Sequence, residues 1–156
     1  MSARGLCNQE IAAARKLVEN ANSAVLRRAG ANQLLFAYRC FLLELAQLYR
    51  LPASADYLSG NELLTALREK LGSDSTIAEL EAFENSAWRK PLERASSAQF
   101  ALQTSEQAIK KELNDNVIRI VQLADSYEPL SSDVLNTSLR TLISLVQQMR
   151  ELGQEY

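Results

Sequence analysis

The sequence predicts an all-α fold, a single-domain bundle of five or six helices that spans residues 1–156. Leu and Ala dominate the composition while aromatic residues make up only 6%, which favours helices over sheets. Apolar residues recur at helical spacing along most of the chain. A chain of 156 residues removes about 70% of its unfolded surface from water, so the core needs no disulfide or metal.

The most apolar stretch, residues 34–52 (LLFAYRCFLLELAQLYRLP), predicts the central helix of this bundle. A membrane span needs about 20 nearly uncharged residues, whereas Arg39, Glu44 and Arg50 interrupt this run. On a helix these charged residues fall on one side. The opposite half is apolar and consists of Leu34, Leu35, Ala37, Tyr38, Phe41, Leu42, Leu45, Ala46, Leu48 and Tyr49. So wide an apolar face indicates a helix that contacts two or three neighbours.

Three further apolar residues, Phe36, Cys40 and Leu43, fall inside the polar side of this helix at the spacing of one surface row. Two explanations remain open. Either another helix or the chain's own linker covers the row, or the row is a seam for a homodimer or a protein partner, since contiguous exposed apolar patches tend to mark contacts.

The region before the central helix predicts a shorter helix over residues 8 to about 20, with Asn8 available as its N-cap. We expect the break between the two helices at Asn20–Ser23, and Gly30 is the alternative. With the first break, Gly30 becomes a close-packing point inside the central helix, at a cost of about 1 kcal/mol relative to Ala.

Two short helices are expected after a loop over residues 51–60. Ser59 and Glu62 stand three apart, which fits a capping box at the start of the first. Gly72 occupies the place of a C-cap. The sequence SDST at residues 73–76 then supplies the cap of the second, whose apolar stripe is Ile77, Leu80 and Phe83.

A turn around ENSAW predicts a longer helix that is capped by Asn85 or Ser86 and continues to about Leu113. Pro91 falls in the first turns of that helix, where proline is tolerated. The β-branched segment Asn116–Ala124 predicts an extended linker before the C-terminal helix, with a helix through this segment as the alternative.

The C-terminal helix is expected to begin at SSDV, residues 131–134. Its apolar seam alternates steps of four and three and consists of Leu135, Leu139, Leu142, Val146, Met149 and Gly153. This pattern favours near-antiparallel bundle packing at about +20°.

Several kinds of chemistry lack their usual residues in this chain. There is no histidine, which removes Ser-His-Asp triads, the di-iron motif of helical bundles and His-based zinc sites. The two cysteines, Cys7 and Cys40, form no CxxC pair, and no glycine-rich phosphate loop is present. We therefore predict a non-enzymatic protein with no cofactor and no metal site.

Two weaker candidate sites remain. Tyr38, Tyr49 and Trp88 are candidates for lining a small-molecule pocket inside the bundle. The first 50 residues carry seven Lys and Arg against three Glu, so Arg27, Arg28 and Arg39 are candidates for a phosphate or nucleic-acid contact. A pI near 5.3 makes general nucleic-acid binding an unfavoured alternative.

A resemblance to a known family adds to this interpretation. The pair Asn8–Gln9, the aromatic-rich helix ending in YRLP, the NSAW sequence around Trp88 and the closing helix LRTLISLVQQMRELGQEY together resemble a family of small proteobacterial proteins whose shared domain has no assigned function. The resemblance implies a bacterial cytoplasmic helical protein and supplies no catalytic residues. The leading hypothesis is a cytoplasmic protein–protein interaction module or homodimer without membrane contact, and the alternatives are a small-molecule-binding bundle and an anion-binding one.

Overall fold

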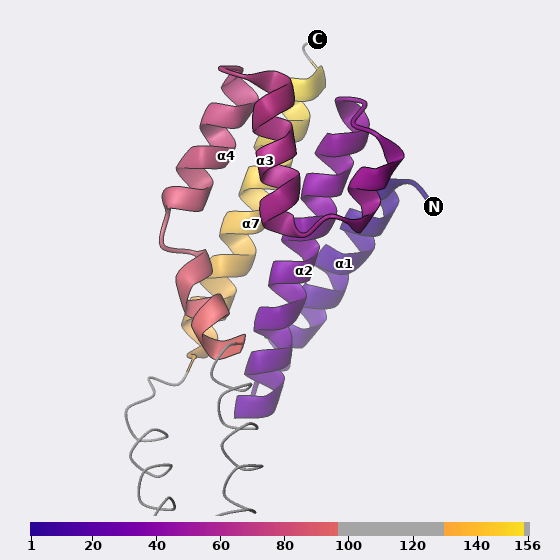
Figure 1. The fold of residues 1–156 in the computed structure, drawn as a ribbon. Coiled ribbons are helices and arrows are strands. Elements are labelled where there is room, and N and C mark those ends of the chain that lie inside the picture. Colours follow the sequence, from indigo (N-terminus) through magenta and orange to yellow (C-terminus); the bar gives the residue numbers. More distant parts are fainter. Residues whose placement is uncertain (97–129, 155–156) are drawn as a thin grey trace, which may run out of the picture.

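The computed structural model describes residues 1–96 and 130–154, and every regular element in these ranges is a helix. Figure 1 shows a helical bundle, which confirms the predicted all-α fold. Its elements are α1 (Ala3–Glu19), α2 (Ala24–Leu48), the 3₁₀ helix η1 (Ala53–Tyr57), α3 (Gly60–Leu71), α4 (Ser75–Asn85), a helical segment over residues 89–96, and α7 (Ser132–Gln154). The predicted extended segment Asn116–Ala124 and the helix to Leu113 fall mainly or wholly outside the described residues.

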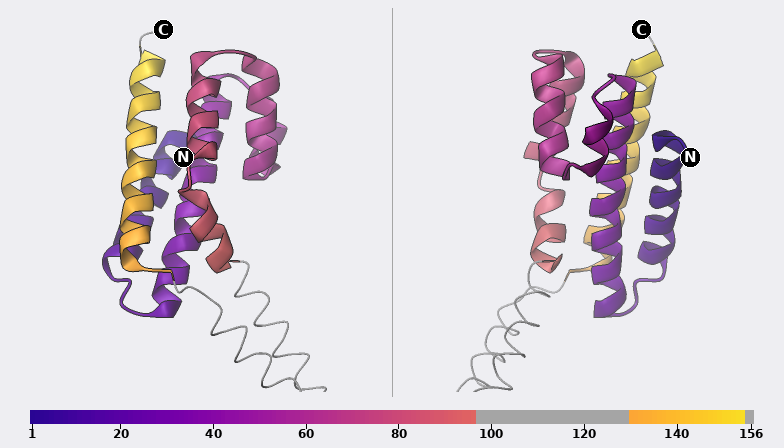
Figure 2. Two further views of the ribbon diagram at one scale, coloured as in Figure 1. Left: turned by 90° about the vertical axis from the view of Figure 1, so that its left-hand side faces the viewer. Right: turned by 45° about the vertical axis from the view of Figure 1, so that its right-hand side comes forward.

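The long helices α1, α2 and α7 run side by side, and α3 and α4 lie on the other side of α2 from α1 (Figure 2). The amide of Ala3 in α1 donates to Gln47 Oε1 in α2, so α1 and α2 are antiparallel. Arg150 of α7 meets Glu44 of α2, near the C-terminal ends of both helices, so α2 and α7 are parallel. As a result α1 and α7 are antiparallel, with the N-terminal half of α1 beside the C-terminal half of α7.

The predicted apolar half of α2 forms the centre of the core. Leu34, Ala37, Phe41 and Leu42 are completely buried, and their neighbours on this face pack into the same cluster. Leu48 is the exception, because it ends the helix with its side chain 55% exposed, so the prediction that it belongs to the buried half is wrong. None of the described helices has the length and apolar character that crossing a membrane requires.

The break between α1 and α2 falls at Asn20–Ser23, as predicted, and Ser23 Oγ accepts the amide hydrogen of Leu26. Gly30 therefore lies inside α2, where it is buried. A methyl group added there would lie 3.6 Å from Val18 of α1 and 3.7 Å from Leu135 of α7. The three long helices thus converge at Gly30, which confirms the predicted close-packing point.

The predicted start of α1 at Asn8 is wrong. The helix begins at Ala3, with Ser2 as its N-cap and the Ser2 hydroxyl accepting the Gly5 amide at 3.1 Å. The additional turn is held by burial of Ala3 and Cys7, which extend the buried stripe towards the N-terminus. Both side chains are small, so their contribution to the hydrophobic pattern is weak.

The caps of the α3–α4 pair are those the sequence predicts. Ser59 and Glu62 form the full capping box, and Gly72 ends α3 with φ +61°, which glycine adopts without strain. Asp74 caps α4 by accepting the Thr76 amide at 2.8 Å, which lowers the pKa of its carboxyl group. The Ser86 hydroxyl donates back to the Phe83 carbonyl at the end of α4, so it does not cap the next helix.

The last helix and the place of Pro91 follow the prediction, but the predicted cap of the helix after α4 is wrong, because Asn85 is the last residue of α4 and Ser86 is the C-cap of α4. Pro91 falls in the first turn of the helix that begins at residue 89. At the start of α7, the Ser131 hydroxyl accepts the Val134 amide at 3.2 Å. The predicted seam Leu135, Leu139, Leu142, Val146 and Met149 is buried in the core, and Gly153 beyond it is half-buried.

Candidate binding groove between α1 and α7

The row Phe36–Cys40–Leu43 is not an exposed surface. Cys40 is fully buried and Leu43 is 8% exposed, whereas Phe36 is 44% exposed. On this side α1 packs along α2, and the Gln33 amide group donates to the Glu10 carboxylate. The chain's own helices therefore enclose most of the row, which was the first of the two explanations, and the three residues do not form a partner seam on the surface.

The candidate pocket residues are packed against other side chains. Tyr38 and Trp88 meet edge to face with ring centroids 5.2 Å apart, and Phe83 completes the cluster at 4.4 Å from Trp88. Tyr49 is not part of these ring contacts, because its hydroxyl lies 2.9 Å from Thr76 Oγ1 at the start of α4. The structure thus brings Tyr38 and Trp88 together as core aromatics and places Tyr49 apart from them.

A polar network covers the edge of this aromatic cluster. The Tyr38 hydroxyl donates to Glu84 at 2.6 Å, and Arg89 donates to both oxygens of the same carboxylate at 2.9 and 2.8 Å. Arg89 also pairs with Glu93. Burial and the bond to Glu84 raise the pKa of Tyr38 well above its usual value. Trp88 Nε1 is buried without a hydrogen-bond partner among the described residues, whereas Arg89 beside it forms ion pairs with Glu84 and Glu93.

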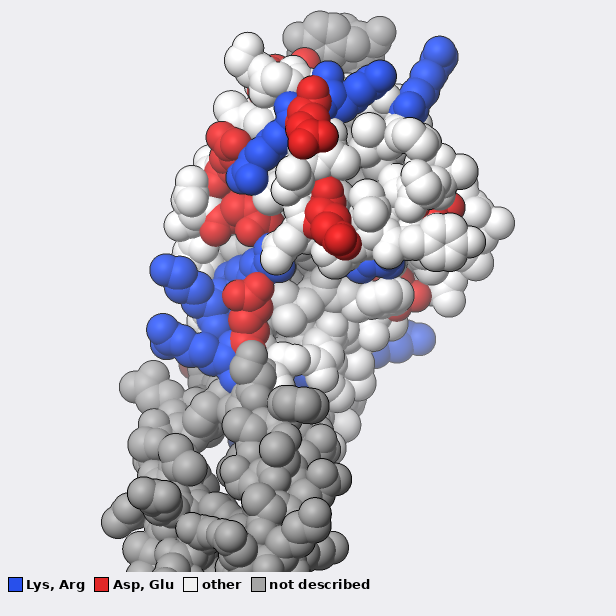
Figure 3. All heavy atoms as spheres, in the orientation of Figure 1, with Lys and Arg blue, Asp and Glu red and all other residues white. Residues whose placement is uncertain are grey.

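The three candidate anion-binding arginines do not form one site. Arg39 donates to the carbonyl oxygens of Leu58 and Asp56 at 2.8–3.0 Å, so it connects α2 to the C-terminal end of η1. Arg28 lies eleven residues earlier, about 16 Å along the helix. Figure 3 shows Lys, Arg, Asp and Glu interspersed over the visible face of the bundle, with no extended surface of one charge among the residues it colours.

A groove of about 190 Å³ lies between α1 and α7, and the sequence did not indicate it. We call it the α1/α7 groove. Each helix contributes four residues at the spacing i, i+3, i+4, i+7. They are Asn8, Ile11, Ala12 and Arg15 from α1, and Ile143, Val146, Gln147 and Arg150 from α7. Four apolar side chains and two amides therefore lie between two arginines, and no Asp or Glu is among these lining residues.

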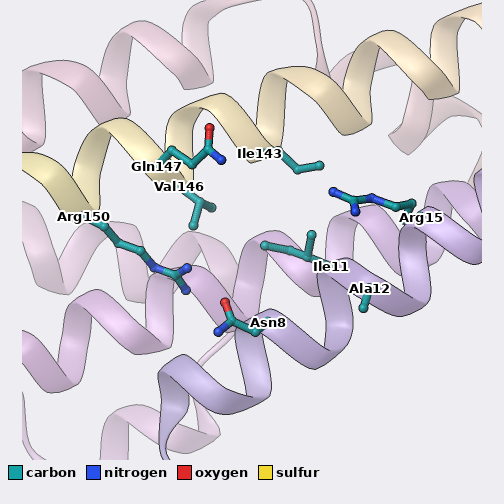
Figure 4. Close-up of a pocket in the computed structure, with 8 residues that line it drawn as sticks. All are labelled: Asn8, Ile11, Ala12, Arg15, Ile143, Val146, Gln147 and Arg150. Atoms are coloured by element: carbon teal, nitrogen blue, oxygen red, sulfur yellow. The ribbon is translucent and has the colours of Figure 1, made fainter.

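The two arginines enter the groove from opposite helices and opposite ends (Figure 4). Because α1 and α7 are antiparallel, Arg15 of α1 reaches towards Ile143 of α7, and Arg150 of α7 reaches towards Asn8 of α1. The Arg15 side chain is exposed and forms no hydrogen bond or ion pair with any described residue.

Arg150 is held by a bidentate ion pair with Glu44, with distances of 2.8 and 2.6 Å. Arg4 lies 4.0 Å from the same carboxylate. The bond to Glu44 raises the pKa of the Arg150 guanidinium further above its usual value. One carboxylate is thus shared by two guanidinium groups and cannot neutralise both, and at the other end of the groove Arg15 forms no ion pair with a described residue.

Cys7 lies beneath this ion pair and is fully buried, as is Cys40. Burial, reinforced by the nearby Glu44 carboxylate, raises the pKa of Cys7 to about 12, and burial also raises the pKa of Cys40. The thiolate is the reactive form of cysteine. Neither thiol is therefore arranged for nucleophilic chemistry.

We expect both thiols of the folded protein to resist a water-soluble disulfide reagent at pH 8. Their burial blocks access, and the raised pKa values keep them protonated. In denaturant both thiols should react at once, and absorbance of the released thiolate measures each state. Rapid reaction of one thiol per chain without denaturant would contradict this placement.

A larger, more open depression of about 320 Å³ lies along α3. It is lined by Leu58 and by one face of α3 alone, and two of its polar residues already have partners. Glu62 belongs to the capping box, and Asn61 accepts from Arg89 at 3.2 Å. The α1/α7 groove is the stronger candidate, because its walls come from two helices and Arg15 has no partner in the described ranges.

Comparison with known protein families, curated proteins and solved structures found no match. The resemblance to the proteobacterial family therefore stays a prediction. Among the described residues no group of three His, Cys, Asp or Glu side chains is close enough to hold a metal ion.

Proposed function

We propose that this protein is a protein–protein interaction module and that the α1/α7 groove is its contact surface. The observation that carries the proposal is the groove itself, which has an apolar floor between two helices. At one end of it lies Arg15, which forms no ion pair with any described residue. This keeps the class of function that the sequence favours and moves the contact from the Phe36–Cys40–Leu43 row to the α1–α7 helix pair.

The size of the groove favours a protein side chain over a small molecule as its occupant. Pockets for drug-sized ligands enclose roughly 300–1,000 Å³ and surround most of the ligand. At about 190 Å³ the α1/α7 groove is smaller and is not enclosed, which suits one or two anchoring side chains of a partner. The aromatic cluster around Trp88 is packed ring against ring and does not favour the small-molecule alternative.

Site-specific photo-cross-linking tests this proposal in the cells that make the protein. A photoreactive amino acid replaces Ala12, an exposed residue that lines the groove, and in a separate variant replaces Ala78, an exposed residue of α4. We expect one protein, identified by mass spectrometry, to be cross-linked from position 12 and not from position 78.

A pair of neighbouring glutamines supplies the matched control. Gln147 and Gln148 are both exposed on α7, but only Gln147 lines the groove. The substitution Gln147→Trp should fill the groove and remove the cross-link from position 12, whereas Gln148→Trp should leave it. No adduct from position 12, or equal adducts in both variants, would contradict the proposal.

A further inference from the structure

We infer that the partner of the α1/α7 groove is an acidic amphipathic helix, with two carboxylates seven residues apart and apolar residues between them. This inference rests on the proposed function and specifies the chemistry of the partner. It follows from the position of the two arginines, the periodicity of the groove walls and the charge at its two ends.

The positions of Arg15 and Arg150 in the two walls determine how far apart the partner's two carboxylates should be. Along α1, seven residues separate Asn8, beside Arg150, from Arg15 at the other end. At a rise of 1.5 Å per residue the two cationic ends are about 10 Å apart. Residues i and i+7 of a partner helix are separated by the same length, so a helix laid along the groove brings one carboxylate to each end.

The periodicity of the groove favours a helix as the partner's conformation. Both walls present residues at i, i+3, i+4 and i+7, and a third helix packs such a row into the gap between two others. Apolar residues at i+3 and i+4 of the partner then lie over Ile11, Val146 and Ile143 at the centre of the groove. The partner becomes one more helix of the bundle, docked beside α1 and α7.

The charge of the groove determines the sign of the partner's charge. Arg15 forms no ion pair with any described residue, and Arg150 shares Glu44, its one ion-pair partner among these residues, with Arg4. Bringing a second positive side chain to either end is unfavourable. A carboxylate gains a charge-assisted hydrogen bond with a guanidinium group at each end.

A synthetic peptide tests the inference directly. The probe is a fluorescein-labelled helix of about 15 residues, stapled on its far face because short helices are marginal in water. It carries two Glu seven residues apart and two Leu at the intermediate positions. We expect it to bind the full-length protein in fluorescence anisotropy, and a matched peptide with both Glu replaced by Gln to bind about tenfold more weakly.

Charge reversal assigns the contact to Arg15. The substitution Arg15→Glu is at an exposed position and should weaken binding of the peptide that carries two Glu about tenfold or more. Replacing one of the two peptide Glu by Lys should restore binding to this variant, and replacing the other should not, which also gives the orientation of the helix. Lys16→Glu, at the next exposed residue outside the groove lining, is the control and should change binding little.

Other outcomes would overturn the inference. Equal affinity for the Glu and Gln peptides, no binding of either, or no rescue by Lys would show that the partner is not an acidic helix, while a position-12 cross-link would still support the interaction function. A dimer in sedimentation that Gln147→Trp dissociates and Gln148→Trp does not would identify the occupant as a second copy of the chain.

Discussion

Replacing Phe41 by alanine is expected to destabilise the protein by about 3–5 kcal/mol, more than any other single substitution proposed for this chain. Phe41 is the largest of the completely buried side chains in the described ranges and lies in the middle of the apolar face of α2. Its removal leaves a cavity among helices that hold one another in place. Because a domain has only about 5–15 kcal/mol of stability in total, this variant should unfold at a much lower urea concentration.

Phe36 supplies the matched control, since it is the same residue type on the same helix. It is 44% exposed, so Phe36→Ala should cost about 1 kcal/mol or less. Urea unfolding followed by circular dichroism measures both variants. Equal losses of stability would show that the buried and exposed sides of α2 are assigned incorrectly.

Replacing Glu44 by methionine is expected to cost about 2–4 kcal/mol. The Glu44 and Arg150 side chains are only 12% and 20% exposed, and their bidentate pair connects α2 to α7. Without Glu44, the Arg150 guanidinium lies half-buried beside the Cys7 thiol, with no counter-charge from the described residues. The loss of stability therefore reflects the unpaired, partly buried charge of Arg150 more than the strength of the ion pair itself.

Two comparisons check this cause by urea unfolding. The double substitution Glu44→Met with Arg150→Met removes both charges and should be less destabilised than Glu44→Met alone. Glu81→Met breaks the exposed pair Arg68–Glu81, whose side chains are 44% and 45% exposed. This substitution should lower the free energy of unfolding by less than about 1 kcal/mol. If the double variant lost as much stability as the two single variants lose together, the explanation by an unpaired Arg150 charge would be contradicted.

Much of the fold could be predicted from local sequence, because caps and apolar periodicity are local properties. The Ser59–Glu62 capping box, the Gly72 terminus and the α7 seam each depend on residues within a few positions of one another. The start of α1 could not be predicted in this way, since Ala3 and Cys7 are too small to mark a stripe. The exposure of Leu48 could not be predicted either, because periodicity does not show that the end of a helix lies beyond its neighbours.

The candidate site could not be predicted for a different reason. Residues 8–15 and 143–150 lie more than a hundred positions apart, and only the packing of α1 against α7 brings them together. A local signal was present, because both groove rows end in arginine at the i+7 position and are otherwise uncharged. The alignment of the two rows depends on contacts such as Gly30 with Val18 and Leu135, which sequence periodicity does not specify.

Amide chemical-shift mapping by NMR tests most directly whether the α1/α7 groove is the binding surface. The isotope-labelled protein is titrated with the peptide that carries two Glu around two Leu. We expect the largest shifts over residues 8–15 of α1 and 143–150 of α7, with α3 and α4 unaffected. Shifts centred on the aromatic cluster around Trp88 or on the depression along α3, with residues 8–15 unchanged, would contradict the account.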